Sequence, residues 1–161
     1  MIIFGCGGIG FAMVAGHRRE EMALLELITA LRYMNSELEY QMTPLPKLCS
    51  HAAQRCNGYV RQILEQLSKE LEDQILPDAS ACMNAAVSKY KNPPERTRTY
   101  LLRLGSSLGC FDLSGQIKGM EAVEREVLLE LSILRENKES RCRNYQTLAL
   151  CAGLALVVLF I

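Results

Sequence analysis

Residues 20–38 read EEMALLELITALRYMNSEL, and this stretch decides the fold class. Its apolar side chains at Leu24, Ile28, Leu31 and Leu38 follow steps of four, three and seven, which is the repeat of one face of an α-helix. The same repeat returns along the charged part of the chain, and no stretch alternates with a period of two for long enough to be a strand. The sequence therefore predicts an all-α fold, a compact bundle of six helices.

Prolines, glycines and capping residues mark the expected breaks between these helices. Thr43 stands before Pro44 and is expected to cap the second helix, because threonine favours the N-cap and proline favours the first turn. Asn57-Gly58 is expected to end that second helix. Asp112 or Ser114 is expected to cap the last helix. Further helix starts are expected near Tyr59, Pro77 and Asn92.

The composition excludes several classes of protein. Lys and Arg total 18, Asp and Glu also total 18, and the resulting net charge of zero argues against a nucleic-acid partner, which normally requires a basic excess. Hydrophobic residues make up 49% of the chain, enough to build a core and to argue against disorder. The 7 cysteines are odd in number and irregularly spaced, which favours reduced thiols over a disulfide framework.

The charges are confined to the middle of the chain, and both ends are bare. Residues 1–16 and 144–161 carry no charge and, as helices, would reach about 24 and 27 Å, slightly less than a hydrocarbon core of about 30 Å. We expect both to be membrane segments, although a buried core helix is the competing interpretation of each. Basic residues flank both on the inner side, at Arg18 and Arg143 among others, so residues 17–143 are expected to form a cytoplasmic helical domain.

Two motifs suggest chemistry, and the sequence argues against both. Gly5 to Gly10 matches the G-x-G-x-x-G dinucleotide fingerprint, but that motif works only between a strand and a helix, and a further helix follows it here. His51 lies between Cys49 and Cys56, yet on a helix it points away from Cys49 and no fourth ligand is near. No catalytic residue, cofactor, metal or small-molecule substrate is predicted.

The small-residue turn that begins at Gly105 is the candidate partner-binding surface. Glycines there are expected to expose backbone beside polar side chains. The residues chosen for this surface are Arg103, Gly105, Gly109, Asp112, Gln116 and Lys118. The alternative is that the two glycines only close one helix and Asp112 only caps the next.

Several strings resemble the stage III sporulation protein AB family along essentially the whole chain. They are ELITALRYMNSELEY (26–40), TPLPKL (43–48) and LLRLGSSLGCFDLSGQIK (101–118). TPLPKL is also similar to a helix start of the inner-membrane platform proteins of type II secretion and type IV pilus systems. The resemblance implies a non-enzymatic sporulation protein in the outer forespore membrane, on the mother-cell side. It also implies a place in the channel complex between mother cell and forespore, with a cytoplasmic ATPase and other membrane subunits as partners.

A second hypothesis uses the same architecture differently. The long, heptad-like last helix, along which Val123, Val127, Leu131 and Leu134 step by three and four, permits binding of a partner by the helix-in-groove mode. The protein would then be a membrane-tethered regulator that sequesters one soluble partner. The acidic residues from Glu121 to Glu139 alternate with basic ones and are expected to form a solvated face.

Overall fold

The computed structural model describes the backbone over residues 3–91, 94–108 and 112–160. Side chains are described for residue 16 and for residues 18–91, 94–108 and 112–136. Within these residues every regular element is a helix, so the predicted all-α bundle of six helices is confirmed. The helices are α1 (Ile3–Gln41), α2 (Leu45–Gln54), α3 (Gly58–Asp73), α4 (Ala79–Ser88), α5 (Glu95–Leu108) and α6 (Leu113–Phe160).

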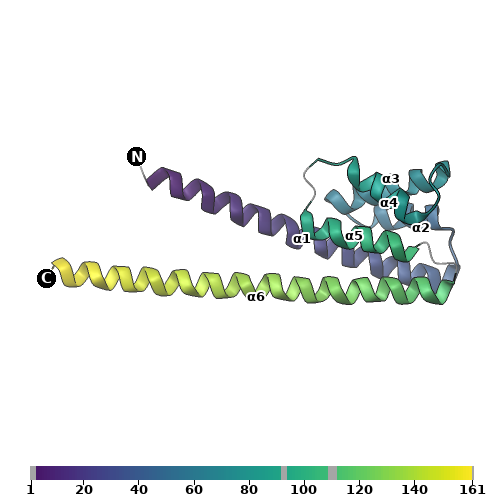
Figure 1. Cartoon of the computed structure of the whole chain (residues 1–161). Helices are drawn as coiled ribbons and strands as arrows, with labels where there is room; N and C mark the ends of the chain where they lie inside the picture. The colour runs from purple at the N-terminus through teal and green to yellow at the C-terminus, as the bar shows by residue number, and fades with distance from the viewer. Residues whose placement is uncertain (1–2, 92–93, 109–111, 161) are drawn as a thin grey trace.

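The two long helices, α1 and α6, run antiparallel side by side, and the four shorter helices cover one side of them (Figure 1). Two ion pairs join them: Arg32 Nε to Glu124 Oε1 at 2.7 Å, and Arg135 Nε to Glu21 Oε1 at 3.1 Å. Residue numbers sum to 156 in both pairs, so they share one antiparallel register about three turns apart. The polarity is reversed between the two pairs, which disfavours a slip of one helix along the other.

One apolar core joins all six helices. Helices adjacent in sequence pack on each other from α2 to α5, and α5 then packs on α6. The stripe expected on the first helix is buried, with Leu24 and Leu31 fully inaccessible and Ile28 and Leu38 almost so. The largest fully buried side chains of the other helices are Leu48, Ile63, Leu64, Leu67, Met83, Leu101, Leu104 and Leu108. The predicted periodicity therefore describes the core correctly.

Two of the expected helix boundaries are wrong. Thr43 does not cap α2, whose N-cap is Pro44, because the Thr43 hydroxyl donates instead to Glu37 Oε1 at 3.0 Å. Asn57 and Gly58 do not end α2, which stops at Gln54. They begin α3, and Gly58 has φ of +59°, a left-handed conformation that glycine adopts without strain.

The two chain ends leave the bundle in the same direction (Figure 1). Where side chains are described, no helix has an apolar stretch long enough to cross a membrane. The expected membrane segments, 1–16 and 144–161, lie outside the residues with described side chains, Gly16 excepted. We call the end from which α1 and α6 project the near end, and the opposite end, where α1 and α5 stop and α6 starts, the far end.

Candidate docking surface

The predicted surface lies at the far end of the bundle (Figure 1), where α5 stops at Leu108 and α6 starts at Leu113. Of the residues chosen from the sequence, Gly109 lies outside the described part of the chain. The other five are brought to α5, to α6 or to the turn between them, but they do not all face solvent.

Gly105 is a packing residue and not part of an exposed turn. It lies inside α5 and is buried. A Cβ placed on it would come within 2.5 Å of the Cβ of Met83 on α4, closer than real side chains approach. The expectation that Gly105 exposes backbone to a partner is therefore wrong, because the missing side chain is what lets α4 and α5 touch.

Asp112 and Gln116 close the ends of the two helices. The Asp112 carboxylate accepts hydrogen bonds from the backbone N–H of Ser114 at 3.3 Å and of Gly115 at 3.2 Å, so it caps α6 as one of the two expected alternatives. The Gln116 amide Nε2 donates to the carbonyl of Leu108 at 2.9 Å and so satisfies an orphan acceptor at the end of α5. Asp112 stays exposed while it caps, whereas Gln116 is half-buried.

Arg103 and Lys118 are both exposed, but they differ in their engagement. Arg103 forms an ion pair with Glu126 on α6, and its guanidinium lies 5.9 Å from the ring centroid of Tyr100. Lys118 projects from the first turns of α6 and is exposed to solvent. Of the predicted set, Asp112 and Lys118 are therefore exposed without an ion pair among the residues with described side chains.

Two far-end residues were missed by the sequence analysis. Tyr40, near the end of α1, is 82% exposed, and Met42, in the turn that follows, is 74% exposed. Met42 also has φ of +48°, an uncommon conformation for a side chain of this size. One signal was available, because Tyr40 is two residues after the buried Leu38 and so falls on the opposite side of the helix. We use the name far-end surface for Tyr40, Met42, Asp112 and Lys118.

The acidic residues of α6 are more engaged than a solvated face would be. Glu124 pairs with Arg32 on α1, whereas Glu126 and Glu130 pair with Arg103 and Arg96 on α5. That part of the expectation is wrong, because these carboxylates face neighbouring helices. Glu121 also pairs with Arg125 one turn along α6, with the charged atoms 3.7 Å apart.

The two rejected motifs have clear positions in the fold. Gly5 to Gly10 lies within α1, where the backbone is helical, so the strand and turn of a dinucleotide site are not formed. Cys49 and Cys56 are buried in the core, and burial raises their pKa to about 12 and about 11. His51 is exposed, with Nδ1 3.7 Å from Glu37 Oε1. In the part of the chain with described side chains, no three His, Cys, Asp or Glu residues are grouped as metal ligands would be.

These features define a small all-α bundle in which the first and last helices form a long antiparallel pair that projects from one end. The family model of stage III sporulation protein AB matches residues 1–161, so the chain belongs to this family of sporulation proteins. The resemblance stated from the sequence is thereby confirmed.

A solved structure supports the same fold. It is described as "Stage III sporulation protein AB (SpoIIIAB)" and aligns with a TM-score of 0.64 at 18% sequence identity. The alignment covers 76% of this chain and 98% of that chain. At this identity the similarity concerns the fold alone. None of the curated proteins compared matches the chain.

Proposed function

We propose that this chain is a non-enzymatic structural component of the complex that joins the mother cell and the forespore. In this proposal both ends anchor it in the outer forespore membrane, and the helical domain lies on the mother-cell side in the cytoplasm. Its far-end surface docks a cytoplasmic ATPase, and its membrane helices contact the other membrane subunits.

The observation that carries the proposal is the common direction of the two apolar ends. Helices α1 and α6 leave the bundle from the near end, and the ion pairs Arg32–Glu124 and Glu21–Arg135 share one antiparallel register. Two uncharged segments that leave one end of a domain can enter the same bilayer. Such an arrangement would hold the far end away from the lipid surface, where a soluble partner has access to it.

The far-end surface has the composition that a protein partner would use. Tyr40 and Met42 are exposed side chains of types enriched in interfaces, and Asp112 and Lys118 supply one charge of each sign at the start of α6. Two opposite charges beside an apolar contact select orientation more than they add affinity.

A crosslinking pull-down of tagged full-length protein from sporulating cells, solubilised in mild detergent, tests the proposal. We expect recovery of a secretion-type ATPase together with membrane subunits of the same complex. Lys118→Glu should reduce the recovery of the ATPase several-fold. The second variant is Asp112→Ser, which removes the negative charge of the far-end surface and keeps a hydroxyl that can cap α6. Arg61→Glu, at an exposed position in the first turn of α3, which starts beside Glu26 of α1 toward the near end, is the control and should bind normally.

The same experiment distinguishes the tethered regulator. Helix α6 leaves Leu129 and Ile133 exposed, at 65% and 49%, one turn apart on its outer side, as a helix-in-groove contact would require. Recovery of one soluble protein in equal amount, without an ATPase or membrane subunits, would favour the regulator and contradict the structural role.

A further inference from the structure

The outer side of α6 carries an exposed apolar stripe. The side chain of Leu129 is the most exposed of the three that form it, and Leu128 and Ile133 are the other two. Leu129 lies two residues after the buried Val127 and two before the buried Leu131, so it falls on the opposite side of the helix from the core. Helix α6 packs mainly on α1 and α5 and forms one edge of the bundle (Figure 1). We use the name α6 stripe for Leu128, Leu129 and Ile133.

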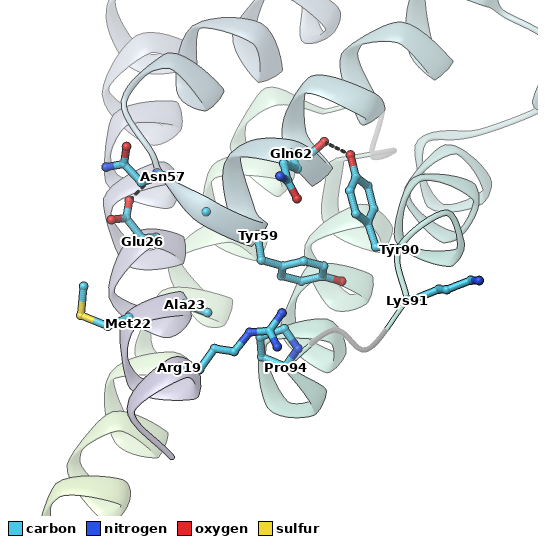
Figure 2. A pocket seen from close by; sticks show the side chains of 11 residues that line it. Arg19, Met22, Ala23, Glu26, Asn57, Tyr59, Gln62, Tyr90, Lys91 and Pro94 are labelled. Carbon is cyan, nitrogen blue, oxygen red and sulfur yellow. Dashed lines mark hydrogen bonds between the residues drawn. The ribbon is translucent and has the colours of Figure 1, made fainter. Parts of the chain in front are cut away.

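The other exposed large apolar side chains lie elsewhere. Met22 lines a pocket between α1 and the start of α3 (Figure 2). Tyr40 and Met42 belong to the far-end surface, and Ile75 lies in the connection between α3 and α4. Among the side chains that the structure describes, only those of α6 therefore expose large apolar groups one turn apart on one side of a helix.

Four ion pairs tie α6 to the helices on either side of the α6 stripe. Each pair joins an arginine to a glutamate, and the arginine is the more exposed member every time: the arginine side chains are 44–63% exposed and the glutamates 18–45%. The pairs are Arg32–Glu124 and Arg135–Glu21 toward α1, and Arg103–Glu126 and Arg96–Glu130 toward α5. The stripe therefore lies between two rows of exposed guanidinium groups.

The charge around the stripe favours an acidic partner. A guanidinium has five N–H donors, so pairing with one carboxylate leaves donors for a second. Arg125 adds a further guanidinium one turn before Leu129, with its charged atom 3.7 Å from that of Glu121. Arginine is also the basic residue best suited to forked contacts with carboxylates at an interface. A second copy of the chain would place these arginines against one another, which disfavours self-association through this side.

We propose that the α6 stripe binds an amphipathic helix of another protein, one whose apolar residues are flanked on both sides by aspartate or glutamate. The apolar residues of that helix pack on Leu129 and Ile133, and its carboxylates accept hydrogen bonds from the two rows of arginines. A helix fits because these two residues are four apart along α6, the spacing of the ridges that pack between helices. The inference is independent of the proposed ATPase docking, because it uses no residue of the far-end surface.

Two labelled peptides test the proposal on the full-length chain in nanodiscs of neutral phosphatidylcholine. They share one leucine stripe, which is flanked by glutamate in the first peptide and by lysine in the second. Fluorescence anisotropy measures their affinity, with empty nanodiscs as the baseline. The glutamate peptide should bind at least about tenfold more tightly than the lysine peptide, and added salt should weaken its binding.

Two variants and their matched controls locate the contact. Leu129→Ser should weaken binding of the glutamate peptide about tenfold, whereas Ile75→Ser, at an equally exposed apolar residue on another part of the surface, should stay within about twofold. Arg125→Gln should weaken binding about threefold, and Arg61→Gln should not. Arg61 is the matched control because it also pairs with a glutamate one turn away on its own helix.

Each outcome has a defined meaning. Tighter binding of the glutamate peptide that depends on Leu129 and not on Ile75 supports the proposal. Equal loss in both serine variants, equal affinity for the two peptides, or binding no stronger than to empty nanodiscs overturns it. A dimer of the chain that dissociates in Leu129→Ser also overturns it, because a second copy would then cover the stripe. Leu129 is 65% exposed, so its replacement should leave the fold intact. The ATPase is absent from this test, so its failure is distinct from failure of the proposed function.

Discussion

The two ends of the bundle close their helices by different means. At the far end, α6 is capped by Asp112, a residue of the same turn. At the near end, α5 is capped from α1: the Glu20 carboxylate accepts from the Arg96 N–H and from the Thr97 hydroxyl, both at 3.4 Å. The start of α3 uses Glu26 of α1 in the same way. The far end is therefore built from local sequence, whereas the near end depends on where α1 lies.

The two ends of the bundle also differ in how closely their helices pack. A side chain at Gly105, toward the far end, would collide with Met83, but a Cβ at Gly16, where α1 leaves the near end, would meet nothing within 4 Å. The far end is a closed packing arrangement, and the near end is open beside the projecting helices. Four experiments test this contrast between the two ends.

Gly105→Ala should lower the free energy of unfolding by about 2 kcal/mol, because overpacking costs about 1–3 kcal/mol and exceeds the gain in helix propensity. Gly16→Ala is the matched control and should be neutral or stabilising by up to about 1 kcal/mol, since it gains propensity without a clash. Chemical denaturation of both variants measures the difference. Equal stability of the two would contradict the close α4–α5 contact.

The core that joins the ends should become less stable in alkali. Burial raises the pKa of Cys49 from 9.0 to about 12, so above pH 9 the unfolded chain loses this proton while the folded chain keeps it. Stability should therefore fall by about 1.4 kcal/mol per pH unit from this thiol between its unfolded and folded pKa. Unfolding at several pH values measures the slope. Cys49→Ala should flatten it, and an unchanged slope would mean that the thiol is not protected.

The capping residues provide a direct test of local against distant closure. Asp112→Ala should cost about 1 kcal/mol and raise amide exchange only in the first turn of α6, while Asp112→Ser retains most of the stability. Glu20→Gln should cost less, about 0.5 kcal/mol, and raise exchange at the start of α5, on a different helix from the mutation. Hydrogen exchange at residue resolution separates the two patterns. Exchange that rises only in α1 after Glu20→Gln would exclude the distant cap.

The register of α1 and α6 gives the smallest effect. Arg32→Glu and Glu124→Arg should each destabilise slightly, and the double variant should recover most of the loss. The coupling energy should be below about 1 kcal/mol, since Arg32 is 63% exposed and such pairs are screened by solvent. A double-mutant cycle by denaturation measures it. A coupling of zero would mean that the Arg32–Glu124 pair does not contribute to the register.

What could be predicted from sequence follows the same division. The helices and the Asp112 cap depend on residues within a few positions. The periodicity of Leu24, Ile28, Leu31 and Leu38 revealed the first helix, and the preference of aspartate for the N-cap revealed the cap. Features set by distant residues could not be seen. Met83 decides the role of Gly105, and nothing near Gly105 in the sequence indicates which helix it meets.

The candidate sites show the same limit. Asp112 and Lys118 are exposed, although Lys118 lies within α6 and not in the turn, and their contact with a partner stays a prediction. Tyr40 and Met42 come from a segment about 70 residues earlier and reach that end only through the α1–α6 pairing. A pocket at the near end, lined by Arg19 of α1 and Tyr59 of α3, was not predicted, because these residues lie on one pocket only in the folded bundle. Thr43 was misassigned for a related reason, as Glu37, one turn and a half earlier, competes for its hydroxyl.

In the proposed function, the near end faces lipid and the far end faces a protein partner. Site-specific photocrosslinking in sporulating cells, with the probe at position 19 or at position 118 of the full-length chain, tests it most directly. The account predicts lipid adducts from position 19 and adducts with a cytoplasmic ATPase from position 118. An ATPase adduct from position 19, or a lipid adduct from position 118, would contradict it.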